Sequence, residues 1–282
     1  MRPFYLNIKG TLHHYTQPVV MGIINFTPDS FFSGSRVHGE DEVRRRAGML
    51  IEEGASMLDI GAYSTRPGAE FVSEDEELKR LEACLEAVRK EAPDIPVSVD
   101  TFRADVARRA VTQMGADIIN DISGGNADTK MLTTVAEIHA PYILMHSRGV
   151  DPTEMQTPMV TEQFLADVLA DLSAKVSQLH LLGVNDIIID PGFGFSKTLE
   201  QNYQLLASLS AFDVFRHPML VGVSRKSMIT KALGITADEA LNGTTVVNTI
   251  ALMGGASILR VHDVKVAREA VEIYTRAFPS TF

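Results

Sequence analysis

The stretch VVMGIIN, residues 19–25, decides the fold, because it is apolar along its length until it ends in Asn25. A short run that is apolar on both faces is typical of a parallel strand covered by helices. The loop that follows, FTPDSFF at residues 26–32, offers the adjacent aromatic residues Phe31 and Phe32 to solvent. An amide at the end of a buried strand indicates a functional site only if other strands repeat the pattern.

Further apolar runs of similar length alternate with longer stretches of helical periodicity. The predicted strands are Val19–Asn25, Met57–Ala62, Pro96–Thr101, Asp117–Ser123, Tyr142–Ser147, Asp186–Pro191, Met219–Ser224 and Ile258–Asp263. This alternation predicts a single-domain α/β protein, a TIM (β/α)₈ barrel spanning residues 18–282. Residues 1–17 are expected to be an N-terminal extension or a short hairpin at the barrel base. An open doubly wound sheet is the alternative, but no glycine fingerprint follows the first strand.

The composition limits the possible partners. The 282 residues carry a net charge of −10, which argues against nonspecific binding to nucleic acid or anionic membranes. No apolar run approaches the roughly 18 residues that would span a bilayer. The single cysteine, Cys84, lies in a predicted amphipathic helix and is expected to be a core residue. We therefore expect a cytoplasmic protein that binds small molecules and has no nucleic-acid or membrane partner.

Every predicted strand ends with a polar or charged group, and in this type of barrel the carboxyl ends of the strands carry the active site. Ser224 and Lys226 are two residues apart, as are Arg260 and His262, so each pair lies on one side of its strand. If those sides face the barrel axis, the cations form a cluster that suits a phosphate or diphosphate. Arg66, on a neighbouring loop, could add a movable cation.

Two carboxylates and an amide are predicted to face these cations, namely Asp100, Asp190 and Asn120. Such groups are costly to bury unless a ligand pairs with them, and a flat heterocycle with an amino-amidine edge would do so. Glycoside hydrolysis is another use for two carboxylates, but it leaves the cations unexplained. A metal held by Asp59, Asp100 and Asp190 is possible, although no HxH or HExxH spacing supports zinc. A magnesium ion shared with a diphosphate and held by Asn25 and waters fits better.

The loop PGFGFSK, residues 191–197, places two phenylalanines between glycines. Because the glycines supply no bulk for packing, an aromatic contact with a flat ligand is expected here. Lys197 is interpreted as a solvated loop residue.

Seven motifs follow one another along successive predicted strands: MGIINFTPDSF, GAYSTRPGA, SVDT, IINDIS, DPGFGFSK, GVSRKSMI and RVHDV. In this order they resemble the dihydropteroate synthase family of folate biosynthesis, the enzymes inhibited by sulfonamides. The resemblance runs from about Val19 to the C-terminal helix. It implies a pterin-binding barrel that joins 6-hydroxymethyl-7,8-dihydropterin diphosphate to 4-aminobenzoate, with release of diphosphate.

The resemblance also implies roles for individual residues. The pterin ring would be held by Asp100, Asn120, Asp190 and Lys226. The diphosphate would be bound by Asn25, Arg260, His262 and Arg66, with Asn25 also a ligand of Mg²⁺. The aminobenzoate pocket would be lined by Thr65, Pro67, Phe195, Ser224 and the Lys226 stem, with Phe31 or Phe32 also in contact. The groups expected to act in catalysis are Asp100, Lys226, Arg66 and Asp29, the last two on loops that close over the site.

The implied reaction is SN1-like, with Asp100 stabilising a pterin carbocation, and the implied assembly is a homodimer. The chain departs from the family pattern at Tyr63, where many members have Glu, and at residues 32–35. Two alternatives share part of the pattern: a barrel that transfers the methyl group of methyltetrahydrofolate, and a non-catalytic pterin-binding paralogue. The first has less need of Lys226 and the Arg260–His262 pair, and the second should have lost such residues.

Overall fold

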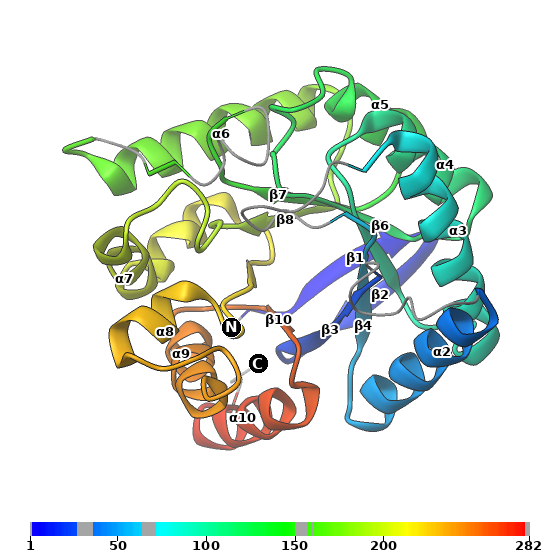
Figure 1. The fold of residues 1–282 in the computed structure, drawn as a ribbon. Coiled ribbons are helices and arrows are strands. Elements are labelled where there is room, and N and C mark those ends of the chain that lie inside the picture. The colour runs from blue at the N-terminus through cyan, green and yellow to red at the C-terminus, as the bar shows by residue number, and fades with distance from the viewer. Residues whose placement is uncertain (1, 27–35, 64–71, 150–156, 159–160, 280–282) are drawn as a thin grey trace.

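The strands of the barrel form one parallel sheet in the computed structural model, which describes residues 2–26, 36–63, 72–149, 157–158 and 161–279 (Figure 1). Within these residues the sheet has eight strands in the order β8-β7-β6-β5-β4-β3-β10-β9. Their bounds are β3 (Val19–Asn25), β4 (Met57–Gly61), β5 (Val97–Asp100), β6 (Ile118–Asp121), β7 (Tyr142–Met145), β8 (Ile187–Asp190), β9 (Leu220–Val221) and β10 (Ile258–Val261). A parallel bridge between Ile189 of β8 and Met219, the residue before β9, joins the first and last strands of this order and closes the barrel. The predicted (β/α)₈ barrel is therefore confirmed, and the open sheet is excluded.

Helices surround the barrel and cover the outer face of the sheet (Figure 1). Their bounds are α2 (Arg36–Glu52), α3 (Glu74–Glu91), α4 (Ala104–Gln113), α5 (Met131–Ile138), α6 (Phe164–Leu181), α7 (Leu199–Ala207), η2 (Leu209–Phe215), α8 (Ser227–Leu233), α9 (Leu241–Met253) and α10 (Val264–Ala277). The link between β9 and β10 contains two helices, α8 and α9, instead of the single helix expected from the sequence. None of the described helices is long and apolar enough to cross a membrane.

Local sequence signals explain where several helices begin and end. The Ser73 hydroxyl accepts a hydrogen bond from N of Glu76 and so caps the start of α3. Helix α7 begins with a complete capping box between Thr198 and Gln201. Cys84 is fully buried on the inner face of α3, which confirms its expected place in the core.

The N-terminal segment forms an antiparallel hairpin of β1 (Phe4–Ile8) and β2 (Thr11–Tyr15). Its alternating side chains Phe4, Leu6 and Ile8 are buried, as expected for a strand with one face against a core. They pack on an apolar layer inside the barrel that is made by Val19, Met21, Met57, Ile118, Ile143, Ile188, Leu220 and Ile258. The hairpin therefore covers the amino ends of the strands and leaves the carboxyl ends for other chemistry.

The register of the sheet places polar side chains directly above this apolar layer. Successive residues of a strand alternate between its faces, so a residue two positions further along shares the face of the first. Two positions after Met57, Ile118, Ile188 and Ile258 come Asp59, Asn120, Asp190 and Arg260. The inside of the barrel thus changes from apolar to polar and charged toward the carboxyl ends of its strands.

Candidate active site

The centre of the polar layer is Arg260, which projects from β10 and contacts two carboxylates, one on β4 and one on β5. Its Nε donates to Oδ2 of Asp59 at 2.6 Å, and its Nη2 donates to Oδ2 of Asp100 at 3.2 Å. The sequence predicts that the cations stand opposite the carboxylates. Instead Arg260 lies among them, because a buried guanidinium is stabilised by direct contact with negative charge.

Asp59 also fixes the amide of Asn120, the next polar residue of the layer. Nδ2 of Asn120 lies 3.3 and 3.4 Å from the two oxygens of the Asp59 carboxylate. With its nitrogen held there, the amide turns Oδ1 the other way, and this buried oxygen has no hydrogen-bond partner among the described residues. An unpaired buried acceptor costs free energy, and a donor group of a ligand would offset that cost.

Burial raises the pKa of both carboxylates predicted to hold a ring. For Asp100 burial is the main cause, nearby Asp59 adds to it and Arg260 opposes it, which leaves a pKa of about 7. The pKa of Asp190 is also raised by burial, against the attraction of Lys226. Its Oδ1 accepts a hydrogen bond from N of Gly192 at 2.7 Å. Both groups would gain from a ligand that brings N–H donors.

Lys226 reaches the same layer from the start of α8. Its Nζ donates to the carbonyl oxygen of Phe193 at 2.5 Å and lies 4.9 Å from the ring centre of Phe195. Burial is the first cause that lowers its pKa, to about 8, and Asp190 and Asp100 oppose the change. Lys226 therefore brings a cation, an apolar stem and a neighbouring aromatic ring to one side of the site.

Ser224 and His262 lie together at the ends of β9 and β10. The Oγ atom of Ser224 lies 3.0 Å from Nδ1 of His262 and accepts a hydrogen bond from the His262 backbone N at 3.2 Å. The next residues, Arg225 and Asp263, form a two-point ion pair with both distances 2.8 Å. These contacts join the two strand ends to each other.

Asn25 ends β3 next to Gly61 of β4. A Cβ at Gly61 would lie 3.6 Å from Oδ1 of Asn25 and 3.9 Å from Oδ2 of Asp100, so this glycine leaves room between the two oxygens. Among the described residues, no group of three or more His, Cys, Asp or Glu side chains could hold a metal ion. The metal site considered for Asp59, Asp100 and Asp190 is therefore wrong, and these groups pair with Arg260, Asn120 and Gly192 instead.

Several predicted site residues lie outside the described residues, namely Asp29, Phe31, Phe32, Thr65, Arg66 and Pro67. Tyr63, which departs from the family pattern, packs edge-on against Phe102 with ring centres 5.4 Å apart. The guanidinium of Arg103 lies 5.4 Å from the centre of each ring.

The loop at residues 191–197 differs in two ways from the prediction. Phe193 is fully buried in the main core, so only Phe195 is placed to touch a ligand. Lys197, expected in solvent, is 7% exposed, and its Nζ lies 3.0 Å from Nδ1 of His146. No signal in the sequence distinguishes a buried lysine in a loop from a solvated one.

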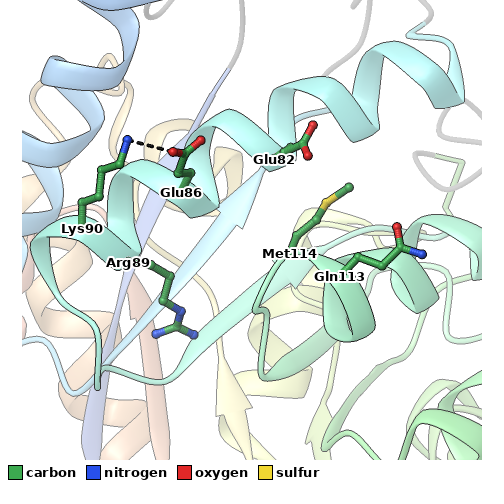
Figure 2. A pocket seen from close by; sticks show the side chains of 6 residues that line it. All are labelled: Glu82, Glu86, Arg89, Lys90, Gln113 and Met114. Carbon is green, nitrogen blue, oxygen red and sulfur yellow. Dashed lines mark ion pairs between the residues drawn. The ribbon is translucent and has the colours of Figure 1, made fainter.

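A separate pocket of about 410 Å³ lies on the outer surface between α3 and α4 (Figure 2). Its lining residues are Glu82, Glu86, Arg89, Lys90, Gln113 and Met114. Arg89 donates to the carbonyl oxygens of Ile95 and Gly115, which precede β5 and β6, so this pocket lies toward the amino ends of the strands. It is not part of the candidate active site.

The fold and the strand-end groups agree with one class of protein. Residues 21–262 match the family model described as pterin binding enzyme, which covers the barrel and the site. The fold and site thus define a pterin-binding barrel enzyme.

Individual relatives narrow this class. The chain is 42% identical to the dihydropteroate synthase of Clostridium beijerinckii over 248 residues, 87% of this chain and 88% of that protein. Its structure is similar to that of Yersinia pestis dihydropteroate synthase with a sulfonamide drug complex, with a TM-score of 0.89 and 37% identity. The match covers 98% of this chain and 100% of that chain. It is also similar to the structure of Xanthomonas albilineans dihydropteroate synthase with 4-aminobenzoic acid. There the TM-score is 0.88 and the identity 34%, and the match covers 98% of this chain and 99% of that chain. The chain belongs to the dihydropteroate synthase family, as its motifs predicted, and is a transferase of folate synthesis.

Proposed function

We propose that Asp100, Asn120, Asp190 and Lys226 hold the pterin ring of the diphosphate substrate. The observation that carries this proposal is the unpaired, buried Oδ1 of Asn120 on the same inner face as two carboxylates of raised pKa. A pterin presents ring N–H and exocyclic amine donors along one edge, and these donors would satisfy such acceptors. Lys226, the one cation among these four residues, would donate to acceptor atoms of the ring.

The diphosphate is proposed to bind beside this ring pocket, at Asn25, Arg260 and His262. Arg260 donates one hydrogen bond from Nε and one from Nη2 to carboxylates. Because a guanidinium has five N–H donors, the others can still bind an anion. Arg66, from the loop after β4, would add a further cation once the site is closed.

Mg²⁺ is proposed as the cofactor, with Asn25 as its protein ligand. The residues fit such an ion, because magnesium commonly keeps several waters and binds through few protein oxygens together with substrate phosphates. Gly61 leaves space beside the oxygen of the Asn25 amide. When bound, the ion would stabilise the negative charge that develops on the departing diphosphate.

The 4-aminobenzoate is proposed to lie against Phe195, Ser224 and the stem of Lys226, with Thr65 and Pro67 completing the pocket. The similarity to a synthase solved with 4-aminobenzoic acid supports this substrate class. The Phe195 ring is partly buried next to Lys226 and so can offer an aromatic surface to a flat ligand.

The proposed step is SN1-like: the bond between the pterin methylene carbon and the diphosphate oxygen breaks, the amine nitrogen then forms the new bond, and the resulting ammonium loses a proton to the released diphosphate or to water. An aromatic amine is neutral at pH 7, so no strong general base is required before attack. Asp100 would stabilise the developing positive charge on the pterin, and Arg260 would stabilise the leaving group. Asp29 and Arg66 would close over the site from their loops.

A turnover assay tests the proposed reaction and separates it from its two alternatives. The purified protein with pterin diphosphate, 4-aminobenzoate and Mg²⁺ should release diphosphate and form dihydropteroate, and chelation of Mg²⁺ should suppress this. Methyl transfer from methyltetrahydrofolate, or pterin binding without turnover, would contradict the proposal. Lys226→Ala and Asp190→Asn should both weaken pterin binding, and unchanged affinity in both would overturn the residue roles.

We further propose a cytoplasmic homodimer, with the outer face of α9 and α10 as its interface. Val246, Ile250 and Met253 follow each other at helical spacing along α9 and are 51%, 41% and 65% exposed. Ile273 of the adjacent α10 is 68% exposed. Helices α9 and α10 contact each other, and large exposed apolar side chains gathered on neighbouring helices are characteristic of an interface between protein chains.

A further inference from the structure

Lys197 is buried at the end of the loop formed by residues 192–197. Its ammonium group donates to the carbonyl oxygens of Gly192 at 2.8 Å and Phe195 at 2.9 Å, and lies 3.3 Å from that of His146. Nδ1 of His146 completes the set at 3.0 Å. The lysine therefore joins two points of its own loop to the end of β7.

Such a contact is chemically demanding, because a buried ammonium loses its hydration. Burial lowers the pKa of Lys197 to about 7, and the carboxylate of Asp190 opposes the change. Burial, followed by the nearby Lys197 charge, lowers the pKa of His146 to about 2, so its imidazole is neutral and can accept from the ammonium. A lysine is retained at such a site only where its hydrogen bonds offset the lost hydration.

The loop itself has a conformation that needs external support. Ser196 has a φ of 53°, an unfavourable left-handed value for a residue with a side chain. At Gly192, where φ is 73°, an added Cβ would lie 1.9 Å from the carbonyl oxygen of His146. The loop is thus pressed against the end of β7, at the same carbonyl group that Lys197 approaches.

Lys197 holds the carbonyl groups of Gly192 and Phe195, and the loop contacts Asp190 and Lys226 through residues 192–195, between and at these two points. The backbone N of Gly192 donates to Asp190, and the carbonyl oxygen of Phe193 accepts from Nζ of Lys226. Phe195, whose carbonyl Lys197 holds, places its ring 4.9 Å from the same Nζ. A shift of the loop would therefore move both Asp190 and Lys226 relative to the barrel.

We propose that Lys197 is a positioning residue of the active site: its ammonium holds the 192–197 loop against β7 and thereby sets the positions of Asp190 and Lys226. This inference rests on the proposed function, in which those two residues hold the pterin. Lys197 touches neither substrate, so its loss acts on the binding of the pterin and, through Phe195, of 4-aminobenzoate.

The test is Lys197→Met, which keeps the length and apolar stem of the side chain and removes its charge and donors. The KM for pterin diphosphate and the Kd of the bare pterin should rise about tenfold or more, the equivalent of one charge-assisted hydrogen bond. Lys175→Met is the matched control: Lys175 is only 13% exposed and pairs with Asp171 at 3.2 Å, so this variant also removes a cation whose charge acts on His146 but leaves the hydrogen bonds of Lys197 in place. Its KM and Kd values should equal those of the unaltered enzyme.

The outcomes separate this inference from the proposed function. If Lys197→Met folds and binds pterin with unaltered Kd while Lys226→Ala loses affinity, the positioning role is wrong and the pterin site stands. If Lys226→Ala also keeps full affinity, the proposed pterin site is wrong. Should Lys197→Met fail to fold, Lys197→Gln decides, since its amide can donate to two carbonyl groups: an intermediate Kd supports the role and an unaltered one refutes it.

Discussion

Arg260 and Asp59 form a buried ion pair across the barrel, with Nε of the arginine 2.6 Å from Oδ2 of the aspartate. Asp59 is fully buried, and the same carboxylate receives Nδ2 of Asn120. One side chain on β4 thus orients a cation from β10 and an amide from β6. Asp59 itself is not among the residues proposed to touch the substrate, so its influence should be indirect.

Asp59→Ala should be costly for stability, because it leaves the Arg260 guanidinium with Asp100 as its remaining ion-pair partner. Removing one partner of a buried pair lowers the free energy of unfolding by about 3–5 kcal/mol. Urea unfolding measures this change. Asp59→Asn keeps the shape and should cost less, but its neutral amide can no longer orient Asn120 and Arg260 together, so pterin affinity should fall about tenfold. Unaltered stability and affinity in both variants would show that the pair is dispensable.

Arg260→Ala should distinguish the diphosphate from the pterin ring. The proposed contact is a charge-assisted hydrogen bond, whose loss costs about 1.5–3 kcal/mol, or roughly 10- to 150-fold in affinity. Calorimetry should find this loss for the diphosphate ester and a smaller one for the bare pterin. Arg260 also neutralises Asp59 and Asp100, so Arg260→Ala should reduce stability as well as affinity. Arg260→Lys keeps the positive charge, should fold better, and is the second variant to measure. Equal losses for the two ligands would remove Arg260 from the diphosphate site.

The period of the strands explains how much of this site can be predicted from the sequence. Two-residue spacing put Ser224 with Lys226, and Arg260 with His262, on one side of each strand, and Arg260 does lie inside the barrel, because register follows from the pattern of apolar residues. The pairing of Arg260 with Asp59 was not predictable in this way, because it depends on side-chain directions across strands far apart in sequence. Lys197 was misjudged for a related reason: its burial depends on the path of the loop, which composition does not determine.

The apolar surface of α9 gives a prediction about assembly. Val246→Glu and Ile250→Glu should each convert a dimer into monomers, because burying a carboxylate without a partner at an interface is strongly unfavourable. Sedimentation equilibrium measures the change in mass. Leu181→Glu is the control, since Leu181 is 90% exposed at the end of α6 and should leave the dimer intact. A monomeric unaltered protein, or dimers that survive both α9 substitutions, would contradict the proposed interface.

The raised pKa of Asp100 predicts a pH dependence of pterin binding. With a pKa of about 7 instead of 3.8, the carboxyl group is mostly protonated in the free enzyme at pH 6 and mostly ionised at pH 8. The N–H donors of a pterin favour the ionised form, so affinity for the bare pterin should rise as the pH increases through 7 and then level off. The folded state binds more protons at this group than the unfolded state between pH 3.8 and 7, so its contribution to stability falls as pH rises across that window.

Proton release separates this titration from other effects of pH on binding. Calorimetry of the bare pterin in buffers of different ionisation enthalpy should detect close to one proton released at pH 6 and little at pH 8. The pKa of Asp190 is raised as well, so the assignment depends on a variant. Asp100→Asn keeps the size of the side chain but cannot titrate, and it should abolish most of the release. Equal release from the variant and the unaltered enzyme would assign the proton to another group, and no release from either would mean that Asp100 is already ionised at pH 6.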